Sequence, residues 1–330
     1  MDWVMRNKVM VGFAAAILVA AYAFHLVSDK AVSMFAYSWS YAIPLVLAAM
    51  VGVIGERSGV VNIGIEGQML VSAFAAFFAS AYSGSLIVGV LSGIGAGLIM
   101  GGFLAWTTVR WRMDQIIAGV VLNIVATGIT SFYYKPGQQL PGLMPNWTIP
   151  GLSKIPLIGP VFFTGTGVFA IAAIIATLLI HFGLFKTRWG LRTRAVGEYP
   201  SAADTAGINV ERLRIVNVTL AGILAGMAGA YLSMDGSSSF ERGMTSGRGF
   251  LALAIMIFGA WRPLRAAAAA LFFGFVSAVG NQLQADQVIK VPPQLIGTLP
   301  YIMTLIVLAL AAGKVRAPGA VGQPFVKGDK

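Results

Sequence analysis

A polar, glycine-rich segment lies inside one of the most apolar stretches of the chain. The segment Gly55–Met69, GERSGVVNIGIEGQM, contains two glutamates, an arginine, an asparagine and a glutamine. Side chains of these types form hydrogen bonds with polar solutes, so Asn62, Glu66 and Gln68 are the first candidates for solute contacts. What they can do depends on the solvent that surrounds them.

The composition is that of a membrane protein. Of the 330 residues, 57% are hydrophobic and 11% are charged, and the mean hydropathy is +0.80. A soluble domain carries about 25% charged residues, and about 20 apolar residues span a bilayer core. Because apolar runs recur along almost the whole length, we expect an all-α, polytopic membrane helix bundle that forms a single transmembrane domain over residues 1–330.

About ten spans are predicted, with eight to ten as the range. They are 9–27, 41–55, 59–81, 86–109, 115–134, 161–183, 214–234, 249–261, 264–283 and 295–312. The first span could instead be a signal peptide, because Arg6 and Lys8 precede an apolar run with an A-x-A pattern at 21–23. A retained helix is the favoured interpretation.

The basic residues are distributed unevenly between the two sides. With a cytoplasmic N-terminus, the inside segments hold all of the 23 lysines and arginines except Lys30, Lys135, Lys154, Arg242, Arg248 and Lys290. This positive-inside bias predicts that both termini, including the tail 313–330, are cytoplasmic. It also explains the net charge of +11 by topology, so nucleic acid is not an expected partner, whereas membrane lipid is.

The sequence contains no known catalytic constellation. It has no cysteine, and its two histidines, His25 and His181, stand alone. A phosphate-binding loop is missing, because Gly313-Lys314 is followed by Val315. We therefore expect no catalytic residue, no metal site and no cofactor bound by this chain; a membrane enzyme is the rival interpretation that this argument disfavours.

Glu66 lies about 10 Å inside the predicted membrane boundary. An unpaired charge there costs about 2.5–3.5 kcal/mol, and the flanking Gly64 and Gly67 favour a broken helix. Non-helical backbone at this depth is tolerated where it is buried in protein or lines a wet cavity. Asn62, Glu66 and Gln68 are thus predicted to line a translocation path, and a purely structural hydrogen-bonding role is the alternative.

Three further residues are weaker candidates for the path. Asn123 and Asn281 lie within predicted spans, where an asparagine that joins two helices is at least as common as one that meets a solute. Phe250 could stack on an aromatic solute, but it also suits the core or the lipid.

The third and eighth spans are short or interrupted by glycine, and they run in opposite directions. Each is preceded by a related tetrapeptide, ERSG at 56–59 and ERGM at 241–244. Interrupted helices in corresponding positions indicate an inverted repeat, which would relate spans two to five to spans seven to ten. The alternative is that short glycine-rich segments occur in many bundles. The four-residue spacing of the glycines at 93, 97 and 101 and at 222 and 226 predicts close helix packing.

Two loops have distinctive sequences. The outside loop, about 135–160, holds six of the 14 prolines and is either a stiff docking surface or a passive linker. In the inside loop 185–214, Pro200 can open a short helix, Gly207 can close it and Asn209 can cap the next helix. The residues between them have small side chains, so this helix either docks into a groove of another protein or is a solvated loop.

Three segments together resemble a known family. GERSGVVNIGIEGQML, RTRAVGEYPSAADTAGINVERLR and GRGFLALAIMIFGAWRPL are similar, in order and spacing, to the integral-membrane permease of bacterial ABC importers for nucleosides, within the wider branched-chain and ribose-type permease superfamily. The resemblance covers about 42–325.

The resemblance implies a coupling segment at about 195–212 that inserts into a cytoplasmic ATPase. The residues that match it are Gly197, Glu198, Pro200, Ala202, Ala203, Asp204, Ala206 and Gly207; Tyr199 stands where relatives often have asparagine. The family supplies no set of solute ligands that can be transferred to this sequence.

The resemblance also implies the partners. They are a second, homologous permease subunit in a heterodimer, a cytoplasmic ABC ATPase that uses ATP and Mg²⁺, and an extracytoplasmic lipoprotein that binds the solute. The expected location is the bacterial cytoplasmic membrane, and the expected activity is uptake by alternating access. Similarity alone favours a nucleoside over a simple sugar; a secondary transporter driven by an ion gradient is the alternative function.

Overall fold

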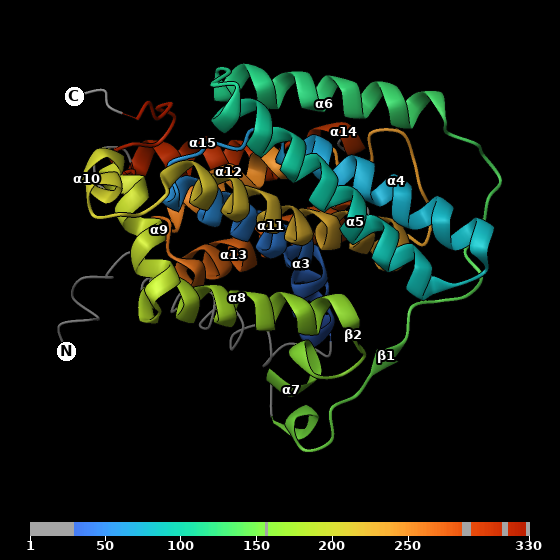
Figure 1. Cartoon of the computed structure of the whole chain (residues 1–330). Helices are drawn as coiled ribbons and strands as arrows, with labels where there is room; N and C mark the ends of the chain where they lie inside the picture. Colours follow the sequence, from blue (N-terminus) through green and yellow to red (C-terminus); the bar gives the residue numbers. More distant parts are fainter. Residues whose placement is uncertain (1–29, 156–157, 286–291, 312–315, 328–330) are drawn as a thin grey trace, which may run out of the picture.

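The computed structural model describes residues 30–155, 158–285, 292–311 and 316–327, which form a helical bundle (Figure 1). The helices of the first half are α3 (Lys30–Arg57), α4 (Ile65–Ser83), α5 (Leu86–Ala105) with the π-helical turn η1 (Trp106–Arg110), and α6 (Gln115–Phe132). A connection follows with β1 (Asn146–Trp147), η2 (Leu152–Lys154), α7 (Ile158–Phe162) and β2 (Thr166–Gly167). The second half contains α8 (Val168–Lys186), α9 (Arg188–Glu198), α10 (Pro200–Thr205), α11 (Val210–Ala230) with the turn η3 (Tyr231–Gly236), α12 (Arg248–Phe258), α13 (Pro263–Ala285), α14 (Pro293–Ile296) and α15 (Leu299–Ala311).

The prediction of an all-α polytopic bundle is confirmed. In the described part of the chain, six segments are long and apolar enough to cross a membrane: Ser33–Arg57, Leu86–Arg110, Gln115–Phe132, Val168–Lys186, Val210–Gly236 and Pro263–Gln282. Every predicted span from 41–55 onward coincides with a helix. The first predicted span, 9–27, and the alternative signal peptide lie outside the described residues.

Three predicted spans differ in detail from the helices. The third begins later than expected, because residues 58–64 are not helical and α4 starts at Ile65. The sixth, predicted to begin at 161, also begins later: its first residues lie in α7 and β2, and the long helix α8 starts at Val168. The tenth is divided into α14 and α15, which a turn after Ile296 separates.

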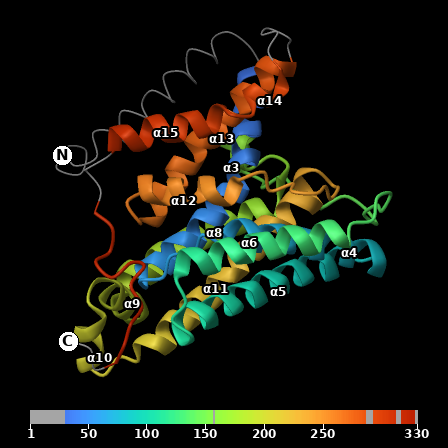
Figure 2. The same ribbon diagram turned by 90° about the horizontal axis from the view of Figure 1, so that it is seen from above.

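Helix α3 forms the centre of the bundle, and most of it is buried against α8, α11, α12 and α13. Figure 2 shows α5 and α6 along one side of α3, and α13 and α15 on the opposite side. The predicted glycine packing is confirmed where α5 crosses α11. A Cβ atom on Gly97 would lie 2.6 Å from the backbone nitrogen of Gly226, so only glycine allows this approach.

The bundle has two distinct ends (Figure 1). One end, here called the α10 end, carries α9, α10 and the C-terminal segment 316–327. The other end, here called the β end, carries the proline-rich connection, in which Asn146 pairs with Gly167 and Trp147 with Thr166 in an antiparallel ladder. Local signals explain the helix starts at the α10 end: the Asp114 carboxylate caps α6 by accepting hydrogen bonds from the backbone N–H groups of Ile116 and Ile117, both at 2.9 Å.

Candidate transport site

The non-helical segment 58–64, here called the break, connects α3 to α4. Gly59 has φ +88°, a left-handed conformation that glycine adopts without strain, and α4 begins with Gly64 as its N-cap. The predicted break around Ile65 and Glu66 is therefore displaced: the non-helical backbone ends at Gly64, and Glu66 lies in the first turn of α4. Its position places the N-terminus of α4 within the bundle.

The carboxylate of Glu66 binds the N-terminus of the short helix α12. Oε1 accepts a hydrogen bond from the backbone N–H of Gly247 at 2.7 Å, and Oε2 accepts one from Gly249 at 2.6 Å. The first N–H groups of a helix have no intrahelical partner and favour a negative charge. Glu66 thus satisfies α12 while it lies in the first turn of α4, and the N-termini of the two interrupted helices meet. This meeting is what an inverted repeat would produce, and the repeat itself stays a prediction.

Asn123, on α6, holds the break from the opposite side. Its Oδ1 accepts a hydrogen bond from the backbone N–H of Gly67 at 2.7 Å, and its Nδ2 donates one to the carbonyl of Ile63 at 3.1 Å. These contacts join α6 to both sides of the start of α4. They correspond to the helix-joining role that was the alternative for this asparagine.

Asn62 and Gln68 form a buried amide pair. The Asn62 Nδ2 donates to the Gln68 Oε1 at 3.3 Å, and both side chains are almost completely inaccessible. Asn62 Oδ1 and Gln68 Nε2 have no hydrogen-bond partner among the described residues. A buried polar atom without a partner costs about 1–3 kcal/mol. The pair therefore leaves one acceptor and one donor beside the break without a hydrogen bond from the described residues.

The residues before the break hold the other end of α12. The indole Nε1 of Trp261 donates to the Glu56 Oε2 at 2.6 Å. Arg57 donates from Nε to the carbonyl of Trp261 at 3.0 Å and from Nη2 to that of Ala260 at 3.3 Å. Residues of the segment 56–66 therefore form hydrogen bonds at both ends of α12: Glu66 at its N-terminus, and Glu56 and Arg57 just after its C-terminus. Sequence reasoning missed Trp261 as a site residue, although its place at the end of the shortest predicted span, 249–261, was an available signal.

The short helix α10 forms as the sequence predicts. Pro200 is its first residue, Gly207 has φ +82°, and the Asn209 Oδ1 accepts a hydrogen bond from the backbone N–H of Arg212 at 2.9 Å. The helix has two faces. Ala203 is buried in a cluster with Val196, Val210 and Phe325, whereas an outer face is exposed; that face consists of Ser201, Ala202, Thr205 and Ala206, with Tyr199, Gly207 and Glu198 beside it.

The α10 region touches the break directly. A Cβ atom on Gly197 would lie 2.9 Å from the carbonyl carbon of Arg57, so α9 packs closely on the backbone at the end of α3. The C-terminal segment adds two bonds: the backbone N–H of Ala320 donates to the carbonyl of Gly197 at 2.9 Å, and that of Gly322 donates to Gly59 at 3.3 Å. The α10 region, the tail and the break thus form one contact network.

Arg214 is the buried centre of this network. Its side chain is 1% exposed; Nε donates to the carbonyl of Ser58 at 3.0 Å, and Nη1 donates to that of Gln323 at 2.9 Å. One guanidinium therefore joins α11, the break and the tail. Neither Arg214 nor the tail was among the predicted site residues, because a contact between residues so distant in the sequence leaves no local pattern.

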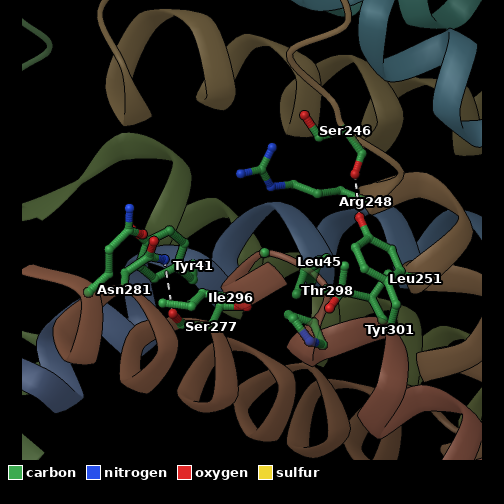
Figure 3. A pocket seen from close by; sticks show the side chains of 13 residues that line it. Tyr41, Leu45, Ser246, Arg248, Leu251, Ser277, Asn281, Ile296, Thr298 and Tyr301 are labelled. Atoms are coloured by element: carbon green, nitrogen blue, oxygen red, sulfur yellow. Dashed lines mark hydrogen bonds between the residues drawn. The ribbon is translucent and has the colours of Figure 1, made fainter. Parts of the chain in front are cut away.

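Two cavities open in the half of the bundle toward the β end. The larger, of about 680 Å³, is lined by α3, the β1–β2 connection and η3, and the smaller, of about 400 Å³, lies between α3, α13 and α15. Tyr41, Ser246 and Arg248 line both of them. Figure 3 shows the smaller cavity, in which the Asn281 Nδ2 donates to the carbonyl of Ser277 at 2.9 Å.

Asn281 is the predicted path residue that lines one of these two cavities. Asn62, Glu66, Gln68 and Asn123 line neither of them, and Phe250, which is 47% exposed, also lies outside both. The role of these residues in a path stays a prediction. No cluster of three or more metal-ligating side chains occurs in the described ranges.

The sequence matches one known family and is similar to two known transport proteins. The family described as "Branched-chain amino acid transport system / permease component" matches residues 34–308. The guanosine ABC transporter permease protein NupQ of Bacillus subtilis (strain 168) is 37% identical over 305 residues, which cover 88% of this chain and 95% of that protein. The nucleoside ABC transporter permease protein NupC of Lactococcus lactis subsp. cremoris (strain MG1363) is 38% identical over 301 residues, with 87% and 94% covered.

Two more distant matches extend this picture. A second B. subtilis protein, the guanosine ABC transporter permease protein NupP, is 25% identical over 298 residues, which cover 84% of this chain and 83% of that protein. A solved structure of an ABC transporter of metal-chelate type, in an inward-facing conformation, matches with a TM-score of 0.54 and 15% identity over 92% of this chain and 99% of that one, which shows the fold alone. Together with the apolar helices, these matches show that the chain is a multi-pass membrane protein that belongs to the permease-component family of ABC transporters.

Proposed function

We propose that the chain is the permease subunit of an ATP-driven importer that moves nucleosides across the cytoplasmic membrane of a bacterium by alternating access. ATP and Mg²⁺ are used by a separate ATPase, and this chain itself is non-catalytic. The names of NupQ and NupC, which refer to guanosine and to nucleosides, support this class of solute. A simple sugar is the competing solute.

The α10 end faces the cytoplasm in this proposal. Basic side chains gather at the ends of the helices that meet there, including Arg57, Arg110, Lys186 and Arg262. Such an excess of positive charge favours the cytoplasmic side. With 9–27 as a retained span, both termini are cytoplasmic, and the proline-rich connection faces outward.

The observation that carries the proposal is the direct contact between the α10 region and the break. The exposed face of α10 docks into the ATPase, and a displacement of α10 reaches the carbonyl of Arg57 through Gly197. From there it reaches α4, and it reaches α12 through the Glu66 carboxylate. ATP drives this change only if it binds the inward and outward states with different affinity.

The solute path lies beside the contact between the N-termini of α4 and α12, here called the joint, which moves during transport. Asn62 and Gln68 offer unsatisfied polar atoms there, and Glu66 and Asn123 control how far α4 can shift against α12 and α6. Asn281 lines the cavity between α3, α13 and α15, and Phe250 follows Gly249, which binds Glu66; in this proposal both meet the solute when it enters. Residues 1–330 act as one permease domain.

Three partners complete the importer. The cytoplasmic ABC ATPase binds α10, and an extracytoplasmic lipoprotein delivers the solute to the connection at the β end. A second, homologous permease forms a heterodimer with this chain. The match to both NupQ and NupP, two guanosine ABC transporter permease proteins of one organism, supports two different subunits.

The test is uptake by the complete complex in proteoliposomes. Labelled guanosine and labelled ribose are compared, each in the presence of an excess of the other, with ATP inside the vesicles. We expect guanosine uptake that requires ATP and that ribose does not reduce. Uptake that persists without ATP under an ion gradient would contradict the proposal, and uptake of ribose alone would reassign the solute.

A further inference from the structure

Three arginine side chains from different parts of the chain converge on the ring of Phe185. The guanidinium carbon lies 5.2 Å from the ring centroid for Arg194, and 5.9 Å for both Arg57 and Arg262. Each distance is within the range of a cation–π interaction. Phe185 is in the last turn of α8, and the arginines come from the end of α3, from α9 and from the turn before α13, all at the α10 end (Figure 1).

Within the described ranges, no carboxylate is a direct partner of these three guanidinium groups. The ion pairs between described residues join Arg110 and Arg112 to Glu211, at 3.4 and 4.0 Å. Glu198 interacts with Arg57 from beyond ion-pair distance, and its Oε2 accepts the backbone N–H of Gly319 at 3.0 Å.

The like charges are close enough to repel one another. Arg194 and Arg262 both act on Arg57 as like charges, and all three surround one aromatic ring. The fold therefore concentrates three positive charges here, and only the more distant Glu198 among the described residues offsets them. An anion with several acceptor oxygens would relieve this repulsion.

The cluster retains donors for such an anion. Arg57 uses Nε and Nη2 for backbone carbonyls and keeps Nη1. Arg194 donates from Nε to the carbonyl of Gly190 at 3.4 Å, its one hydrogen bond to the described part of the chain, and the side chain of Arg262 is exposed. The forked donors of arginine match the geometry of a phosphate group.

Apolar side chains next to the cluster identify the source of the phosphate. Phe182, one turn before Phe185 on α8, is 61% exposed, and Leu264, two residues after Arg262, is 45% exposed. Both belong to helices that are long and apolar enough to cross the membrane. An acyl chain would cover these side chains, whereas a soluble phosphate would leave them in water.

We propose that Arg57, Arg194 and Arg262, arranged around Phe185, bind the phosphate of an anionic phospholipid in the cytoplasmic leaflet. Basic pockets between membrane helices on the cytoplasmic side are suited to such headgroups. The proposal rests on the topology given under Proposed function, in which the α10 end is cytoplasmic. It does not depend on the transported solute or on the ATPase.

The test compares two lipids on the purified full-length chain in detergent. Dioleoyl-phosphatidylglycerol and dioleoyl-phosphatidylcholine are titrated, and bound lipid is counted by native mass spectrometry. We expect the anionic lipid to bind more tightly. The double variant Arg194→Gln, Arg262→Gln is expected to lower its affinity about tenfold or more and to leave phosphatidylcholine binding unchanged, since each basic side chain contributes roughly 1 kcal/mol toward an anionic headgroup.

A matched control removes two basic residues elsewhere at the same end. The double variant Arg110→Gln, Arg112→Gln should keep the affinity of the wild type, because these arginines face Glu211. If the Arg194/Arg262 variant does not fold, the exposed Arg262→Gln alone is measured and should still lose affinity. Equal binding of both lipids to the wild type, or an equal loss in the control variant, would overturn the proposal. Displacement of phosphatidylglycerol by millimolar inorganic phosphate would overturn the lipid as the source and leave a soluble-anion site.

Discussion

Glu66 and Gly249 hold the two interrupted helices together at their N-termini. The Glu66 Oε2 accepts the backbone N–H of Gly249 at 2.6 Å, and a Cβ atom on Gly249 would lie 2.5 Å from the backbone nitrogen of Glu66. The contact therefore needs both a carboxylate on α4 and the absence of a side chain on α12. It joins the two halves of the chain at the point where α4 and the short helix α12 begin.

Replacing Gly249 with alanine should separate this joint. The new methyl group would meet backbone atoms of Glu66, which cannot move away as a flexible side chain can, and overpacking of this kind costs about 1–3 kcal/mol. We expect Gly249→Ala to lower the melting temperature of the detergent-purified protein. Gly95→Ala on α5 is the control, because a Cβ there meets nothing within 4 Å. Equal stability of the two variants would show that the close approach does not constrain the fold.

Glu66→Gln should weaken the same joint without changing its size. The carboxylate accepts two backbone hydrogen bonds, whereas the amide offers one acceptor and points an N–H group at the second donor. Hydrogen bonds to charged groups contribute about 1.5–3 kcal/mol each, so a clear loss of thermal stability is expected. Glu241→Gln, at an exposed position in the loop before α12, should have little effect. If Glu66→Gln and Glu241→Gln have the same melting temperature, Glu66 does not stabilise α12.

Local signals in the sequence predicted the elements of this site well. The break follows from glycine and polar residues inside an apolar run, and α10 follows from Pro200, Gly207 and Asn209, each of which acts on its own backbone. The family match supports the same interpretation at the level of the whole chain.

The partners of these residues could not be predicted from the sequence. Glu66 binds residues 181 and 183 positions away, and Arg214 binds a carbonyl 109 positions away. No periodic pattern records such distances, because they arise only when the bundle is packed. The buried and exposed faces of α10 could not be predicted either, because its six residues show no amphipathic period. Ala203 is buried by residues outside α10, among them Phe325 of the tail.

Ala202 and Ala203 should respond differently to tryptophan. Ala203 is 4% exposed within an apolar cluster, so Ala203→Trp should overpack the cluster and destabilise the permease by about 1–3 kcal/mol or more. Ala202 is exposed, so Ala202→Trp should leave the melting temperature unchanged and should block docking. Copurification of the ATPase and ATP-dependent uptake measure docking. An Ala202→Trp permease that keeps both would contradict the assignment of the exposed face as the ATPase contact.

Arg214→Met should release the C-terminal segment from the break. Methionine fills most of the space of the side chain but cannot donate to the carbonyls of Ser58 and Gln323, and each buried carbonyl left without a donor costs about 1–3 kcal/mol. We expect faster amide hydrogen exchange in a peptide that spans 319–325, measured by mass spectrometry on the detergent-purified protein. The control is Arg212→Met, because the Arg212 side chain is exposed two residues earlier on the same helix. Unchanged exchange in Arg214→Met would mean that the cluster around Phe325 holds the tail without the arginine. Faster exchange together with reduced ATP-dependent uptake would instead place the tail in the contact network through which α10 acts on the break.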